Sequence, residues 1–220
     1  MLLSNPLQFI INAIYLVPAL VIGIVGHELA HAAVAVSRGD QTPKIDGRLS
    51  LNPQNHLDPL GTLAVFFIYF GWAKPLRLNP FRMLNALDPV LVWIAGPLAS
   101  FLIALALSIP LRLALNASLP ALASPLLQLL LVIFYFNVLL AVINLIPIPG
   151  LDGYNLLAAL FRRRFGRIFH RLESSRQVIL LIAVGILIFA PFLLGQSIFN
   201  YFYSPIAAWL LGTSVRPAGF

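Results

Sequence analysis

Two histidines and one glutamate lie within five residues of each other in the strongly apolar stretch VGHELAHAA, residues 25–33. In a helix, positions i and i+4 share a face, so His27 and His31 can present two imidazole nitrogens to one ion. Glu28 is rotated from His27 by about 100° and can reach a water molecule on that ion without binding the ion itself. The three residues therefore predict half of a metal site with an acid–base group beside it.

The same residues have simpler interpretations, because the histidines could hydrogen-bond to neighbouring helices or the pattern could arise by chance. The chain has only four histidines and two glutamates, which makes a chance match on the order of one in a thousand. Ionisable groups buried in a membrane are costly and usually functional. The pattern His-Glu-x-x-His is the one that zinc hydrolases use, so a metal site is favoured over both alternatives.

A catalytic zinc ion usually takes three protein ligands and leaves a fourth position for water. Most of the other acids and histidines have ordinary expected roles in polar loops, at a helix start or at lipid headgroups: Asp40, Asp46, Asp88, His170 and Glu173. Three candidates for the third ligand remain, which are His56, Asp58 and Asp152.

Asp152 is the strongest of these candidates. It follows the segment NLIPIPG, in which two prolines and Gly150 break a helix and let a carboxylate turn inward at membrane depth. The alternative is an ordinary turn or N-cap aspartate in the tripeptide LDG. The depth that Asp152 shares with His27 and His31 favours the ligand role.

The composition is that of an integral membrane protein. Of the 220 residues, 60% are hydrophobic and only 10% are charged, and the mean hydropathy is +0.93, which is far outside the range of soluble domains. No cysteine is present, so disulfides and thiolate metal sites are excluded. The net charge of +7 predicts contact with anionic lipid headgroups and no nucleic acid partner, because the basic residues cluster beside apolar runs.

The N-terminal third predicts one spanning helix followed by a polar connection and a short apolar insertion. The apolar run 7–37, with Pro18 as a possible kink, is long enough to cross a bilayer. Residues 38–59 are polar, and the alternation in 44–52 predicts a short β-hairpin. Residues 60–72 are apolar but too short to span, so we expect a loop that enters the membrane and returns.

The rest of the chain predicts three further spans and offers a candidate for a fourth. Spans fit residues 89–111, 122–148 and about 177–195, and the arginine-rich stretch 161–176 predicts an interfacial helix. Residues 197–212 could span or lie at the interface. We therefore predict an all-α polytopic membrane protein with four to five spanning helices, a membrane-inserted loop and a short β-hairpin. Residues 1–220 would form one domain, with a core at about 7–160 and C-terminal helices at about 161–212.

Loop charges predict the orientation of the chain. Basic residues follow the first predicted span, precede the second and follow the third, whereas the connection 112–121 offers only Arg112. By the positive-inside tendency the first three groups lie in the cytoplasm. His27 and Asp152 would then both lie toward the cytoplasmic side of a multi-pass protein of a prokaryotic cell membrane.

The ordered set of motifs resembles the site-2 proteases, which are intramembrane zinc metalloproteases, and in particular their small bacterial members. The motifs are GHELAH, GRLSLNPQNHLDPLGT, GWAKP, AGPLAS and NLIPIPGLDG, and they cover most of residues 20–160. The resemblance implies a core of spanning helices with an intervening membrane-inserted loop, and transmembrane proteins as substrates. We expect no PDZ or CBS domain to gate those substrates.

The resemblance also implies that the two histidines of GHELAH and Asp152 bind one zinc ion, with Glu28 as the general base. Two positions depart from the usual pattern. Gly150 replaces the second proline of PPLDG, and Ile143 stands where an aromatic residue is common. These departures are expected to loosen the turn that aims Asp152.

The residues themselves support hydrolysis of a peptide bond. Zinc activates its water, and Glu28 takes the proton and later delivers it to the leaving amine. Asn144 is a candidate donor to the oxyanion, but together with Asn137 it could equally form hydrogen bonds between helices. His56 could also be a donor, although capping of a turn is favoured.

A substrate helix hides its own peptide bonds, so it must unwind and reach the metal as an extended strand. Such a strand could pair with an exposed strand edge of the enzyme. We expect that edge in the hairpin 44–52 or in the insertion 60–72.

Two other functions remain open. Membrane metal transporters also build ion sites from broken helices with polar residues at depth, although a transport site has no need of a base such as Glu28. A relative that binds transmembrane helices without cutting them is the second alternative. The sequence does not decide the oligomeric state, or zinc against cobalt or iron.

Overall fold

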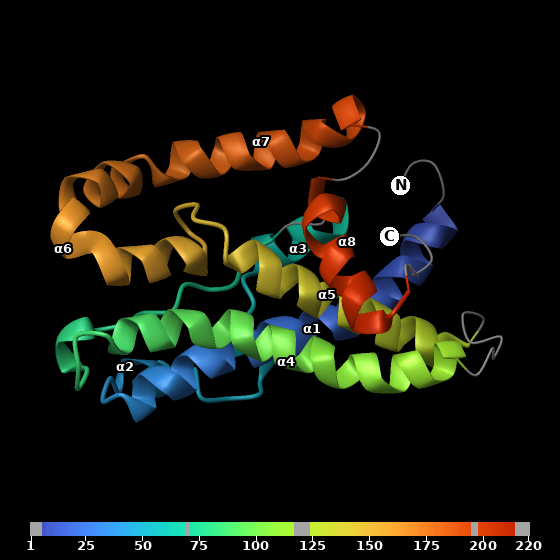
Figure 1. The fold of residues 1–220 in the computed structure, drawn as a ribbon, viewed down its shortest axis with the longest axis horizontal. Helices are drawn as coiled ribbons and strands as arrows, with labels where there is room; N and C mark the ends of the chain where they lie inside the picture. The colour runs from blue at the N-terminus through green and yellow to red at the C-terminus, as the bar shows by residue number, and fades with distance from the viewer. Residues whose placement is uncertain (1–5, 69–70, 117–123, 195–197, 214–220) are drawn as a thin grey trace.

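The computed structural model describes residues 6–68, 71–116, 124–194 and 198–213, and these ranges contain helices and no strand (Figure 1). Two short 3-10 turns, η1 and η2, lie in the connection between the first two long helices. The elements in chain order are α1 (Pro6–Ser37), α2 (Thr42–Ile45), η1 (Pro53–Asn55), α3 (Pro59–Ile68), η2 (Pro80–Arg82), α4 (Asp88–Asn116), α5 (Pro125–Asn144), α6 (Asp152–Ser174), α7 (Arg176–Leu194) and α8 (Ile198–Leu211).

Three of the described helices, α1, α4 and α5, are long and apolar enough to cross a membrane. They pack against one another as one bundle (Figure 1), and they correspond to the first three predicted spans. The predicted span 177–195 corresponds to α7, whose described apolar part, Arg176–Ile186, is shorter than a span. The 14 residues of α8 are also fewer than the about 20 that a spanning helix needs.

The predicted membrane-inserted segment, 60–72, forms α3 and packs on the first half of α1. Val65 is buried in a cluster with Leu16 and Leu20 of α1. The chain then returns close by, because a Cβ at Gly61 would lie 2.1 Å from the carbonyl oxygen of Trp72. Residues 69–70 lie outside the described part of the chain. One face of α3 is therefore covered by α1, whereas Leu60 and Leu63 on the same helix are exposed.

The β-hairpin predicted over residues 44–52 does not form. Thr42–Ile45 is a helical turn, α2, with a proline among its first residues, and Gly47 follows with φ +71°. Pro43 favours a helix start because it has no backbone N–H to leave unpaired. The alternating pattern was therefore a local coincidence. The β pairing found among the described residues is one isolated antiparallel bridge between Leu57 and Ala73.

The predicted break after the third span lies between α5, which ends at Asn144, and α6, which begins at Asp152. Gly150 in this segment has φ +107°. Proline is locked near φ −65°, so the usual second proline could not adopt the conformation that residue 150 has here. The glycine fits a turn of different shape, which delivers Asp152 to the start of a helix.

The C-terminal helix α8 packs across α4 and α5 (Figure 1). Ala207 and Leu210 are buried in one cluster with Phe134 of α5. The guanidinium of Arg112 in α4 donates to the carbonyl oxygens of Trp209 and Leu210. These are carbonyls of the last turn of α8, which no residue of the helix itself can satisfy, so α8 is fixed to the bundle at its end.

Candidate metal centre

The structure brings three of the residues singled out by sequence to one point between α1 and α6. Nε2 of His27 lies 2.9 Å from Oδ2 of Asp152, and Nε2 of His31 lies 3.2 Å from the same oxygen. The two imidazole nitrogens are 3.1 Å apart. All three residues are buried. Together they form, in the part of the chain that the structure describes, a group that could hold a metal ion.

Hydrogen bonds from α4 set the chemistry of the two imidazoles. Nδ1 of His31 lies 2.6 Å from the carbonyl oxygen of Val92, and a carbonyl can only accept, so Nδ1 carries the proton. In neutral His31 the inner nitrogen, Nε2, therefore presents a lone pair. Nδ1 of His27 lies 3.0 Å from Oγ of Ser100, which leaves Nε2 of His27 free to do the same.

This arrangement fits a zinc ion. Two nitrogen lone pairs and a carboxylate oxygen that converge in a buried space repel one another unless a cation or proton lies between them. Two histidines and one carboxylate are a ligand set of catalytic zinc sites. The outer hydrogen bonds to a carbonyl and a hydroxyl are those that orient histidine ligands around metals.

Gly96 of α4 provides the space in which the imidazoles meet. A Cβ at this position would lie 2.1 Å from Nε2 of His31 and 2.6 Å from Nε2 of His27. Any side chain would therefore displace the two nitrogens. One turn further along α4, Ser100 contacts His27 directly.

Glu28 lies beside this group, half-buried, on α1. It makes no hydrogen bond or ion pair with any residue that the structure describes. Its charge interacts with those of His27, His31 and Asp152. The carboxylate is therefore close to the three converging side chains and is not occupied by a structural contact.

The backbone before α6 holds Asp152 in place. A Cβ at Gly153 would lie 2.2 Å from the carbonyl oxygen of Leu145, so the first turn of α6 is pressed against the segment that follows α5. This close approach makes the position of the carboxylate depend on the whole connection 145–151. The break predicted from prolines is thus also a packed junction.

The two asparagines of α5 do not reach another helix with the bonds observed. The Asn144 amide donates to the carbonyl oxygen of Leu140 at 3.0 Å, and the Asn137 amide donates to Ile133 at 2.8 Å. Both bonds lie within α5. Asn137 is fully buried and its Oδ1 has no partner, whereas Asn144 is half-buried.

The other two candidates for a third ligand have structural roles. His56 is fully buried and its Nε2 donates to the carbonyl oxygen of Ser50 at 2.7 Å, in agreement with the favoured turn role. The Asp58 carboxylate accepts from the N–H of Gly61 at 2.8 Å and so caps α3. Neither belongs to the group around Asp152.

The remaining acids are also accounted for by contacts with the protein. Asp46 forms a two-bonded ion pair with Arg77, as expected for a loop acid. Asp88 begins α4 and accepts from the N–H of Asn85. Asp40 differs from the prediction of a solvated or ion-paired group, because it is completely buried and accepts hydrogen bonds from backbone groups.

Arg48 is a residue that sequence reasoning missed. It is only 7% exposed, and its Nη2 donates to the carbonyl oxygens of Lys74, at 3.1 Å, and Pro75, at 2.7 Å. Its charge acts on the Glu28 carboxylate. Arg48 therefore fixes the GWAKP segment near the acid–base residue.

Comparisons with known proteins agree with this geometry. The profile of peptidase family M50 matches residues 107–192, which include Asp152 but not the two histidines. A Bacillus subtilis protein named "Putative zinc metalloprotease YwhC" is 40% identical over 154 residues, which are 65% of this chain and 67% of that protein. A Mycobacterium tuberculosis protein named "Putative zinc metalloprotease Rip2" is 28% identical over 194 residues, 86% of this chain and 69% of that protein.

No solved structure matches the chain. The relation to YwhC nevertheless covers about two thirds of both proteins, and the family profile covers the segment that carries Asp152. The converging imidazoles and carboxylate are the metal-binding groups that such an enzyme requires. The chain therefore belongs to peptidase family M50, the metalloprotease family of the site-2 proteases.

Proposed function

We propose that this protein is an intramembrane zinc endopeptidase that cleaves peptide bonds within or next to transmembrane segments of membrane proteins. One observation carries the proposal, which is that Asp152, at the start of α6, meets two histidines and a glutamate of α1, a helix apolar enough to span a membrane. The proposal treats residues 1–220 as a single membrane-embedded catalytic domain.

In this mechanism His27, His31 and Asp152 would hold the ion, which would supply Lewis acidity toward a water molecule and the substrate carbonyl. Glu28 takes a proton from the attacking water and returns it to the leaving amine. No described residue forms a hydrogen bond or ion pair with Glu28, so both of its carboxylate oxygens are available to a water molecule, which supports this role. Val92 and Ser100 keep the imidazoles in the required orientation.

Asn144 is our candidate for the donor that stabilises the oxyanion. One amide hydrogen is used within α5, and an amide has two, so the second hydrogen is available to a substrate. The position of Asn144 at the last residue of α5 supports this role, since the following segment leads directly to Asp152. Asn137 is buried within the bundle and is not part of this proposal.

The substrate segment unwinds before cleavage, because a helix hides its peptide bonds. Residues 44–52 cannot supply a strand edge, since they contain α2 and turns. The better candidate is the extended segment that begins at Gly71 and already forms one bridge through Ala73. Pairing of backbone groups there would present an extended peptide to the metal.

The site is expected to face the cytoplasmic side of a multi-pass protein. The support is the distribution of basic residues, which are abundant in the connection after α1 and in α6 and scarce between α4 and α5. Transmembrane proteins are accordingly the proposed substrates, and α7 and α8 are the candidates for a fourth and a fifth span.

The first test compares the wild type with Glu28→Gln and Glu173→Gln in detergent. Glu173 is the other glutamate of the chain, and its side chain is exposed on α6. We expect equal bound zinc in all three proteins, and cleavage of a panel of single-span substrates reduced about 10²–10⁴-fold only by Glu28→Gln.

Other outcomes separate the alternatives. Equal zinc without cleavage by any of the three proteins, across a broad panel, would favour transport or helix binding. Zinc uptake into wild-type proteoliposomes in the same preparation would select transport. Full cleavage by Glu28→Gln would remove Glu28 as the base while leaving the protease intact.

A further inference from the structure

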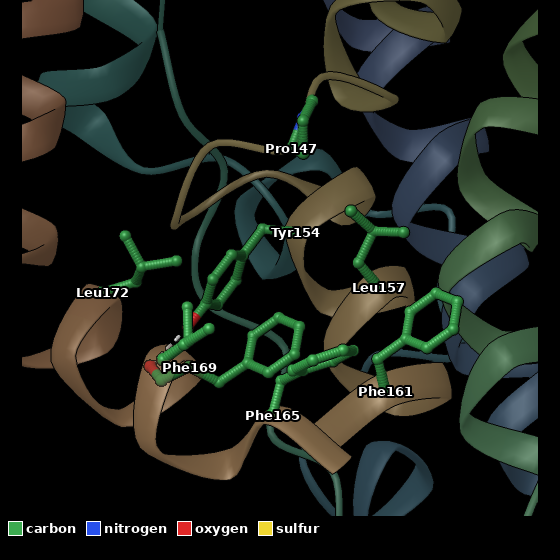
Figure 2. A pocket seen from close by; sticks show the side chains of 8 residues that line it. Pro147, Tyr154, Leu157, Phe161, Phe165, Phe169 and Leu172 are labelled. Atoms are coloured by element: carbon green, nitrogen blue, oxygen red, sulfur yellow. Dashed lines mark hydrogen bonds between the residues drawn. The ribbon is translucent and has the colours of Figure 1, made fainter. Parts of the chain in front are cut away.

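An apolar pocket of about 450 Å³ lies on α6, outside the metal centre (Figure 2). Its walls are almost entirely hydrocarbon and come from α6 and from the segment before it. The lining side chains are Pro147, Tyr154, Leu157, Phe161, Phe165, Ile168, Phe169 and Leu172. Neither the metal ligands nor Glu28 contributes to this pocket.

A kink in α6 creates the pocket. Phe165 has φ −120° and ψ 31°, which are not helical values, so the two halves of the helix turn toward each other (Figure 1). The halves are joined by the Tyr154 hydroxyl, which donates to the carbonyl oxygen of Phe169 at 2.9 Å. The two rings also contact edge to face, with centroids 5.7 Å apart. The floor of the pocket is thus buried and fixed.

The rim of the pocket is open and apolar. Phe161 is 44% exposed, Phe165 is 43% exposed and Ile168 is 55% exposed. Figure 2 shows Phe165 between Phe169 and Phe161 along the pocket. A concave apolar site of this kind takes a hydrophobic ligand, because burial of its walls is favourable by roughly 25 cal/mol per Å².

Two arginines stand at this rim. The guanidinium carbon of Arg164 lies 5.8 Å from the centroid of the Phe165 ring. Arg162 and Glu173 both interact electrostatically with the Tyr154 hydroxyl. The negative charge of Glu173 is met by Arg176, 3.6 Å away, so the rim as a whole is positive.

These features fit an anionic phospholipid. We propose that one acyl chain of such a lipid fills the pocket and that its phosphate binds Arg162 and Arg164. A transmembrane helix is a poorer fit, since a helix with its side chains is about 10–12 Å across and 450 Å³ would hold about one turn. Arginine forks match phosphate oxygens.

The bound lipid would press on the segment that carries Asp152. Pro147 lies before this residue, Tyr154 lies two residues after it on the same helical turn, and both line the pocket. An acyl chain in the pocket therefore braces the junction between α5 and α6 from one side, while Leu145 supports it from the other. The lipid site itself does not depend on proteolysis.

The test uses purified full-length protein in nanodiscs that contain a photoactivatable acyl-chain probe on either phosphatidylglycerol or phosphatidylcholine. Cross-linked residues are mapped by mass spectrometry. We expect the anionic probe to label α6 around Phe161 and Ile168 several-fold more than the zwitterionic probe does. The double variant Arg162→Gln/Arg164→Gln should lower this labelling by about fivefold.

Two further variants control the experiment. Arg163→Gln/Arg167→Gln removes the same charge from two other exposed positions of α6 and should leave the labelling unchanged. Ile168→Trp fills the pocket at an exposed position and should abolish labelling with an unchanged melting temperature. This variant keeps the proposal testable if the double variant does not fold.

Several results would overturn the lipid site. Equal labelling by both probes would indicate ordinary lipids around the protein without a specific site. Equal losses of labelling in the two double variants would indicate that the anionic lipid is attracted by the overall positive charge of α6. Displacement of the probe by an uncharged single-span peptide, but not by phosphatidylglycerol, would assign the pocket to a polypeptide.

Discussion

Each imidazole of the metal centre uses both of its nitrogens. The inner nitrogens of His27 and His31 face Asp152, and the outer nitrogens bond to Ser100 and to the carbonyl oxygen of Val92. All of these groups lie in a buried environment, where an incorrectly oriented ring would leave a polar atom unpaired. The affinity for zinc should therefore depend on α4 as well as on the ligands.

Ser100→Ala tests this dependence at the scale of one hydrogen bond. The change removes the group 3.0 Å from Nδ1 of His27, so we expect about tenfold weaker zinc binding, at the lower end of what outer-shell changes cause. The affinity is measured by competition with a chromophoric chelator. Ser108→Ala is the matched control, because the Ser108 hydroxyl bonds to Leu105 within the same helix. An equal loss in both variants would contradict the argument.

The three candidate ligands carried a clearer sequence signal than the groups around them. His27 and His31 are one helical turn apart, so local spacing was sufficient to pair them. The sequence signal for Asp152 was weaker, because it consisted only of the prolines and glycine that break the helix before it. The contacts of Gly96 and Ser100 depend on which face of α4 meets α1, and no local pattern in a uniformly apolar helix contains that information.

The connection between α1 and α4 is held by buried polar groups. Asp40 accepts from the N–H and hydroxyl of Thr42, at 3.0 and 2.6 Å, and from the N–H of Asn79, at 2.6 Å. These bonds join the two ends of a long connection. Burial acts to raise the pKa of Asp40, but the hydrogen bonds outweigh burial and hold the pKa below the ordinary value of 3.8.

Asp40→Asn should lower the free energy of unfolding by about 1–3 kcal/mol, because a buried hydrogen-bonded carboxylate is replaced by a weaker and partly mismatched acceptor. Asp46→Asn is the control, since its partner Arg77 is 76% exposed and an exposed ion pair contributes at most about 1 kcal/mol. Unfolding is followed by denaturant titration in detergent. Equal losses in the two variants would contradict the role of burial.

The same pair of variants has a defined pH dependence. The lowered pKa means that Asp40 stabilises the fold fully above its unfolded pKa and loses this effect as pH falls through the lower folded value. The difference between the wild type and Asp40→Asn should be constant between about pH 5 and 8 and shrink below about pH 4.

At this scale the helices were largely predictable, whereas the connections were not. Long apolar runs identified α1, α4 and α5, since a spanning helix has few alternatives. The prediction of a hairpin was wrong because it used the alternating pattern of residues 44–52 alone. Pro43, just before this stretch, favours the start of a helical turn. Asp40 was assigned to solvent because its backbone donor, Asn79, is far away in the sequence.

The whole molecule places its basic connections at one end. The helical turn α2 and the kink of α6 both lie at the left end of Figure 1, whereas α5 begins at the right end. If this end is cytoplasmic, the positive-inside tendency is satisfied by the fold as well as by the sequence.

The absence of cysteine allows the orientation to be measured directly. Lys44→Cys, Arg167→Cys and Leu126→Cys each place one thiol at an exposed position. An impermeant maleimide should label the first two in inverted vesicles and the third in spheroplasts. Labelling of Lys44→Cys and Arg167→Cys from opposite sides would contradict the arrangement in Figure 1.

The metal centre joins side chains that are 125 residues apart in the chain, His27 and Asp152. During synthesis at about 5–20 residues per second, the histidines therefore enter the membrane about 6–25 s before the carboxylate exists. The nascent protein passes through this interval with an incomplete ligand set. The three groups of the candidate metal centre are thus complete only after α4 and α5 have been made.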